Sequence, residues 1–173
     1  LAVFGCLLGY TKISDEMKDA ELRKMVERIG YTEGLPVVVD PGILDPKEFI
    51  DTVLNVRIPN PFMPDTPQRI ATDTSQKLAI RFGETVKNYL ASKDKDIKNL
   101  KLIPGWLWYL MAVDDNGEKF ELSPDPLLET VCPVVAGIKF GDTDVEEMIR
   151  PLLTNRAIFG VDLYEAGLAG LTV

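Results

Sequence analysis

Four prolines, at positions 59, 61, 64 and 67, set the strongest local constraint on how this chain can fold. Proline lacks a backbone N–H group and pushes the preceding residue toward extended geometry, so no regular helix can run from residue 58 to 66. A dense run of polar side chains comes next, ending at Lys77. By pattern alone, the stretch from Ile58 to Lys77 is either a solvated polar turn between two helices or a stiff binding loop.

Apolar residues recur every three or four positions on both sides of this stretch, which is the pattern of amphipathic helices. The predicted helices cover residues 15–29, residues 45–56, and the segment from about Thr74 to Ser92. The expected start and stop signals are Ser14 and Gly30 for the first, Asp45 with Pro46 for the second, and Thr72 or Asp73 for the third.

Helical signals also dominate the rest of the chain. Residues 102–113, "LIPGWLWYLMAV", are apolar on all sides and predict a buried helix with both tryptophans in the core, ending at the turn signal "DDNG". A serine cap followed by proline begins "SPDPLLETV", and Pro133 and Pro151 are expected to break or kink the chain just after them. The only β-branched run, "LPVVVD" at 35–40, fits a short strand or the tail of a buried helix. We therefore predict a mainly α fold, a bundle-like helical assembly.

The residue content excludes several classes of function. The net charge of −8 argues against a nucleic-acid-binding protein and is typical of cytoplasmic enzymes. The chain has no histidine, which removes histidine bases, triads and zinc ligands, and the spacing of Cys6 and Cys132 favours two buried, reduced thiols. No metal-ligand cluster, glycine-rich phosphate loop or membrane-spanning segment is predicted.

Arg69 and Lys77 are the best candidates for binding a ligand. If Pro67 begins a helix that continues through both residues, their spacing of eight corresponds to roughly 80° of rotation, so the two cations could flank one cleft. A guanidinium and an ammonium that converge on a pocket suit a small oxygen-rich anion or a polyol. The alternative, in which both residues belong to a solvated turn, stays open from the pattern.

Four segments resemble the mannitol dehydrogenase family, also called the polyol-specific long-chain dehydrogenases. "NPFMPDTPQRIATDTSQK" is similar to that family's "NP…D…RI..D.S.K" segment, and "LAVFGCLLGY" resembles the helix that comes after its Lys-x4-Asn-x2-His motif. "GWLWYL" with "DDNGEKFELSPDPL", and later "RAIFGVDL", resemble its Gly-Trp helix and its C-terminal element. The segments occur in the family's order and extend over essentially the whole chain.

The resemblance implies that residues 1–173 form the helical, substrate-binding C-terminal domain, with a fold like the C-terminal domain of 6-phosphogluconate dehydrogenase. An N-terminal Rossmann domain that binds NAD, together with the catalytic Lys-x4-Asn-x2-His motif, would precede Leu1, so no catalytic and no cofactor-binding residue is expected here. Catalysis in the family needs no metal. By position, Arg69 and Lys77 match the residues that contact the substrate, a sugar acid or polyol. Asn60 is expected to form a turn, and Asp73 to cap a helix or orient Lys77.

The proline-rich "PNPFMPDTP" is closer to the fructuronate reductase, or mannonate oxidoreductase, branch than to the mannitol dehydrogenases. We therefore expect an NAD-dependent enzyme that interconverts D-mannonate and D-fructuronate. The alternatives are a mannitol 2-dehydrogenase, a tagaturonate reductase, or a helical interaction module that binds no sugar. The module would leave Arg69 and Lys77 apart and solvated.

Overall fold

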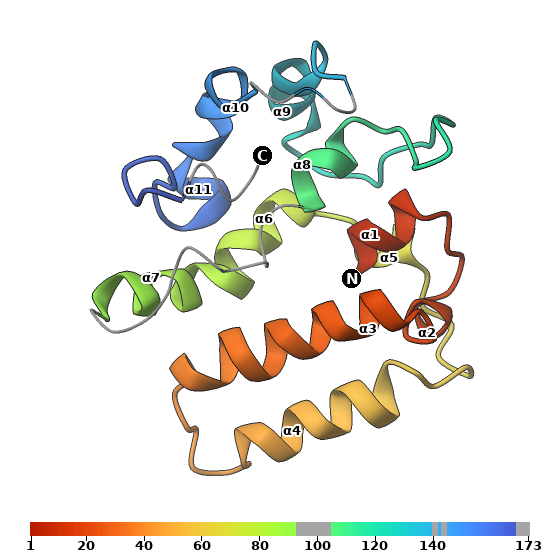
Figure 1. Cartoon of the computed structure of the whole chain (residues 1–173), viewed down its shortest axis with the longest axis vertical. Helices are drawn as coiled ribbons and strands as arrows, with labels where there is room; N and C mark the ends of the chain where they lie inside the picture. The colour runs from red at the N-terminus through yellow and green to blue at the C-terminus, as the bar shows by residue number, and fades with distance from the viewer. Residues whose placement is uncertain (93–104, 140–141, 143–144, 169–173) are drawn as a thin grey trace. The chain divides into compact units, whose positions relative to one another are not determined.

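The computed structural model describes residues 1–92, 105–139, 142 and 145–168 (Figure 1). The described chain divides into two compact units, Leu1–Ala71 and Thr72–Val173, here called the first and second unit. Both units are helical, and the β-pairing within the described ranges is a single antiparallel bridge between Val113 and Lys119. The mainly α prediction is thus confirmed. No helix in these ranges is long and apolar enough to cross a membrane.

The first unit contains five α-helices, two π-helical turns and a 3-10 turn. They are α1 (Ala2–Leu7), α2 (Ile13–Glu16), α3 (Ala20–Glu27), η1 (Arg28–Gly34, π), η2 (Leu35–Val37, 3-10), α4 (Pro46–Thr52), η3 (Val53–Arg57, π) and α5 (Pro67–Ile70). Figure 1 shows α3 with its continuation lying antiparallel to α4, while α5 packs against α1.

The single helix predicted over residues 15–29 is wrong at both ends. The chain turns between α2 and α3, and Asp19 rather than Ser14 caps the longer helix: its Oδ1 accepts from the N–H groups of Glu21 (2.8 Å) and Leu22 (3.1 Å). Gly30 does not stop the helix, because a π-helical turn continues through it. A Cβ at Gly30 would lie 3.2 Å from Ile50 Cγ2, so this glycine lets α4 approach closely.

Residues 35–40 form no strand. Leu35–Val37 are the 3-10 tail of the long helix, while Val38 and Val39 are extended and exposed. The second predicted helix begins as expected, with Pro46 as its first residue and the Asp45 side chain accepting from Glu48 N–H at 2.8 Å. Its predicted apolar face is only partly buried, since Leu54 is buried but Phe49 is exposed.

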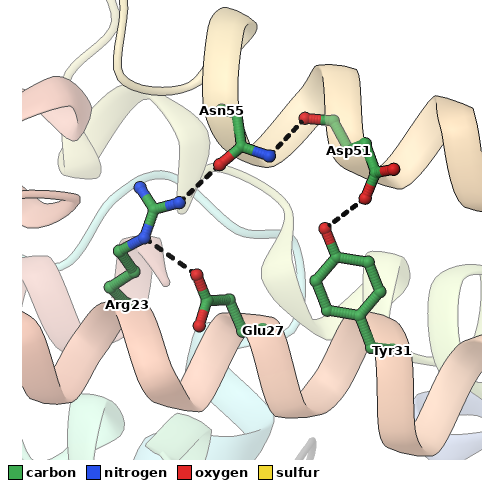
Figure 2. Close-up of polar contacts among 5 residues, drawn as sticks. All are labelled: Arg23, Glu27, Tyr31, Asp51 and Asn55. Carbon is green, nitrogen blue, oxygen red and sulfur yellow. Dashed lines mark hydrogen bonds and ion pairs between the residues drawn. The ribbon is translucent and has the colours of Figure 1, made fainter.

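Polar side chains join the two helices of the hairpin (Figure 2). Arg23 donates to Glu27 on its own helix (2.8 Å) and to Asn55 across the hairpin (2.5 Å). Tyr31 Oη donates to Asp51 at 2.6 Å, and Asn55 Nδ2 donates to the Asp51 carbonyl at 2.9 Å. Because every side chain in this network already has a protein partner, we read it as a structural link between the helices.

The second unit begins with α6 (Thr74–Leu78), which runs through the π-helical turn η4 (Ala79–Gly83) into α7 (Glu84–Ala91). The helix predicted from Thr74 to Ser92 is therefore confirmed, with its last helical residue at Ala91. The remaining described helices are α8 (Gly105–Leu110), α9 (Leu128–Val135), α10 (Glu146–Leu153) and α11 (Arg156–Phe159).

Helix α8 is nearly all buried, as predicted for residues 105–110; residues 102–104 lie outside the described part. Trp106 is a core residue that meets the Phe159 ring edge-on at 5.7 Å, and Trp108 is half-buried. Pro133 and Pro151 lie inside α9 and α10, respectively. Each helix continues for two residues past its proline and then ends, so the chain is interrupted after each proline as expected. Ser123 caps no helix: it is buried, and its N–H donates to Tyr109 Oη at 2.8 Å.

Candidate functional site

Arg69 lies on the short helix α5 at the end of the first unit. Thr66 caps this helix by accepting from Arg69 N–H at 3.1 Å, and the buried Pro67 is its first residue, so the predicted helix start at Pro67 is confirmed. The Arg69 side chain is 67% exposed and forms an ion pair with Asp65, one turn earlier. Asp65 also fixes the loop, because its carbonyl accepts from Ile13 N–H at 3.1 Å.

The sequence prediction missed Asp65, although its spacing of four from Arg69 is the signal for an ion pair on a helical turn. The pair orients the guanidinium and leaves its remaining N–H groups able to donate to a ligand. Arg69 is thus an exposed cation with a fixed anchor, an arrangement suited to carboxylate or hydroxyl groups.

Asn60 forms the turn that was predicted for it. Its Oδ1 accepts from Phe62 N–H at 3.0 Å, and its carbonyl accepts from Met63 N–H at 3.1 Å. Phe62 lies at the tip of this turn and is 91% exposed. The proline-rich segment is therefore ordered by local hydrogen bonds, as a stiff loop rather than a linker.

Lys77 lies on α6, at the start of the second unit, and is half-buried. Its backbone N–H donates to the Asp73 carbonyl at 3.1 Å. The residues from Arg69 to Lys77 are not on one continuous helix: α5 ends at Ile70, and Asp73 adopts left-handed backbone angles (φ 54°) before α6 begins. The unit boundary falls between Ala71 and Thr72, so the two cations belong to different units, and their convergence on one ligand stays a prediction.

Asp73 occupies the N-cap position of α6, as one of the two expected start residues, but its side chain makes no cap hydrogen bond. The cap comes instead from Asp125, which accepts from Ser75 N–H at 2.7 Å and also from Ser75 Oγ. The adjacent Pro124 carbonyl accepts from Asp73 N–H at 2.9 Å, and Asp125 further accepts from Leu127 N–H at 3.0 Å just before α9. No local pattern could identify this cap, because it is 50 residues from the helix it serves.

Neither cysteine has the character of a catalytic nucleophile. Burial, with a smaller effect from the charge of Glu16, raises the pKa of the Cys6 thiol to about 11. Burial also raises the pKa of Cys132. Both thiols therefore stay protonated at neutral pH. Both are free, as predicted, but only Cys6 is buried, whereas Cys132 is half-buried.

The described residues fit neither a metal nor a dinucleotide. Within them, no group of three or more acidic or cysteine side chains could hold an ion. A dinucleotide cradle needs a strand that leads through a glycine-rich turn into a helix, and the described ranges contain one isolated bridge in place of strands. A shallow cleft in the second unit, between α8, α9 and α10, is lined by apolar and aromatic side chains and lacks the polar groups that would hold a polyol.

The described chain is multi-helical with an ordered loop that carries Arg69, and comparison with known proteins places it in a family. Residues 1–169 match the mannitol dehydrogenase C-terminal domain, so the chain belongs to the mannitol dehydrogenase family. It is 57% identical to a D-mannonate oxidoreductase from Thermotoga maritima and 33% identical to an uncharacterized oxidoreductase, YdfI, from Escherichia coli. These matches cover 97% and 94% of this chain, but 32% of each relative.

A solved structure gives the same fold. Pseudomonas fluorescens mannitol 2-dehydrogenase, in a ternary complex with NAD and D-mannitol, aligns with a TM-score of 0.83 at 22% identity, over 99% of this chain and 33% of that one. The chain thus spans about a third of the length of the relatives it matches.

Proposed function

We propose that this chain is the substrate-binding C-terminal domain of an NAD-dependent oxidoreductase that interconverts D-mannonate and D-fructuronate. The observation that carries the proposal is the 57% identity to a D-mannonate oxidoreductase over 97% of the chain. For comparison, the identity to a mannitol dehydrogenase from Saccharomyces cerevisiae is 30%. NAD as cofactor is supported by the complex of the mannitol 2-dehydrogenase with NAD.

In this proposal the catalytic groups and the nicotinamide lie on chain that precedes Leu1, and this domain holds the substrate. A sugar acid presents a carboxylate and several hydroxyl groups, and holding it in register requires several fixed donors. Arg69, anchored by Asp65, suits the carboxylate, and Lys77, on a helix fixed by Asp125, supplies a second donor. Asn60 supports the loop that carries Arg69.

Steady-state kinetics of the full-length protein test the substrate. Reduction of D-fructuronate, D-tagaturonate and D-fructose by NADH is measured at equal enzyme concentration, and we expect the highest kcat/KM for D-fructuronate. A higher value for D-fructose would identify a mannitol 2-dehydrogenase, and a higher value for D-tagaturonate a tagaturonate reductase. No turnover of any of the three would favour the interaction-module alternative.

A further inference from the structure

Glu16, the last residue of α2, is a carboxyl group that the proposed function leaves unexplained. Its side chain is fully buried, and neither carboxyl oxygen has a hydrogen-bond partner within the described part of the chain. Ser14, on the same turn, is also buried, and its hydroxyl likewise lacks a partner there. Buried polar groups in native proteins are nearly always hydrogen-bonded, so two on one turn indicate a contact that completes them.

The surroundings of Glu16 show where such a contact would lie. The carboxyl group packs on the backbone of α1, where a Cβ at Gly5 would lie 2.2 Å from Glu16 Oε1. The backbone nitrogen of Leu1, one turn before Gly5, is buried and feels the charge of Glu16. Glu16 is therefore next to the point where chain preceding Leu1 would join α1.

A buried carboxyl group can exist in two ways. It either keeps its proton, or it ionises and is paired with donors that replace the lost water. Burial raises the pKa of Glu16 to about 8, against a smaller lowering by the charge of the Leu1 amino group. Even the protonated form would leave an acceptor oxygen and an O–H donor unsatisfied, so the protonated state alone does not account for the geometry.

We infer that a cationic side chain on the segment leading into Leu1 pairs with the Glu16 carboxylate, which makes Glu16 a positioning residue for that segment. The inference rests on the proposed function, which puts the catalytic groups on the same segment. Glu16 then touches neither substrate nor cofactor. Its role is to hold in place the chain segment that carries the reacting groups.

The test compares the thermal stability of full-length wild-type protein, Glu16→Gln and the control Glu21→Gln between pH 5 and 9. Glu21 is an exposed acid on α3 whose ion pair with Lys24 is solvated. If Glu16 is paired and ionised, its pKa lies below the unfolded value, so its stabilising effect is present at high pH and is lost as the pH falls. Because the folded and unfolded pKa values of Glu16 then both lie at or below about 4.3, Glu16→Gln should lower the melting temperature by a similar amount throughout pH 5–9, while the control should change little.

The opposite sign would overturn the inference. A protonated, unpaired Glu16 has a raised pKa, so its burial costs increasingly more as the pH rises from the unfolded pKa toward 8. Glu16→Gln would then match the wild type near pH 5 and exceed its stability at pH 9. The neighbouring groups do not titrate in this window. Cys6 and Tyr10, which feel the charge of Glu16, have raised pKa values and stay protonated, and the nearby Asp15 and Asp19 have lowered pKa values and stay ionised.

Two further measurements keep the test decisive. If Glu16→Gln does not fold, infrared titration of the wild-type protein reports the protonation state of the carboxyl group directly, and a buried carboxylic-acid band that persists at pH 7 would overturn the inference.

In the active enzyme, Glu16→Gln should lower kcat by roughly 10- to 100-fold with little change in either KM, as expected when reacting groups are misplaced. An unchanged kcat would reject the positioning role, whereas a wild-type protein without dehydrogenase activity would reject the proposed function and leave the pH test standing.

Discussion

At the scale of single residues, Arg69 is an exposed charge whose position is fixed by its neighbours. Its guanidinium is exposed, yet Asp65 holds it and Thr66 fixes the backbone beneath it. An arginine in such a pair loses less conformational entropy on binding than a free one. The prolines of this loop add to the effect by limiting the backbone conformations of its neighbours.

Replacing Arg69 by alanine should raise KM for the sugar acid far more than KM for NADH. The loss of a hydrogen-bonded charge pair with a substrate carboxylate costs about 1.5–3 kcal/mol, which is roughly 10- to 100-fold in kcat/KM. Kinetics of the full-length variant with each substrate varied separately measure the split. Arg57→Ala, an exposed arginine of the same unit, is the matched control. Equal rises in both KM values would argue against a substrate role.

Helices in this chain are defined by caps, and only some of these caps can be read from local sequence. Asp45 with Pro46 was predictable because cap and first residue are adjacent. Ser14 was the predicted cap of the first long helix, but the cap is Asp19, to which Tyr10 also donates. The cap that Asp125 provides for α6 could not be predicted, because no periodicity links residues 50 positions apart.

Replacing Asp125 by alanine should destabilise the full-length protein by about 1–3 kcal/mol, because the fully buried Ser75 would lose the acceptor for both its N–H and its hydroxyl. Chemical denaturation measures this loss. Because α6 carries Lys77, KM for the sugar acid should rise as well. Asp114→Ala, which removes an acceptor within the 113–119 turn, is the control. It should lower the stability of the protein without changing KM.

Two glycines set the approach between η4 and α11. Gly160 has φ +78°, and a Cβ there would lie 3.1 Å from Gly83 Cα. Gly160→Ala should therefore cost about 1–3 kcal/mol of folding free energy, through left-handed strain together with steric crowding. Gly137→Ala is the control, because its Cβ would make an ordinary contact with Met148. Equal unfolding midpoints for the two variants would show that the close approach is not rigid.

On the scale of the whole molecule, the sequence supported the fold class and the family, but not the placement of the two cations in one site. The prediction of two cations on one helix assumed that α5 and α6 were continuous. The left-handed backbone of Asp73 interrupts the two helices. A positive φ is uncommon for residues other than glycine, so the run of polar residues did not predict this interruption. Four segments in family order were therefore more informative than helical geometry.

Residues 1–173 alone should neither bind NADH nor oxidise it. The described part of this chain has no dinucleotide cradle, and the chain spans only a third of its relatives. Fluorescence titration with NADH compares the chain with the full-length protein, which should bind it. Saturable binding to the chain alone would contradict the proposed division between a cofactor domain and a substrate domain.

The two hydrogen bonds between Ser75 and Asp125 also have a consequence for folding during translation. Translation releases Ser75 from the ribosome 50 residues before Asp125, so the start of α6 waits for its partner while the intervening chain is synthesised. A long-range contact of this kind forms late, since the intervening loop must close first. The cap of the helix that carries Lys77 therefore cannot form before Asp125 has been synthesised, and a nascent chain cut short before Asp125 would leave this helix without its cap.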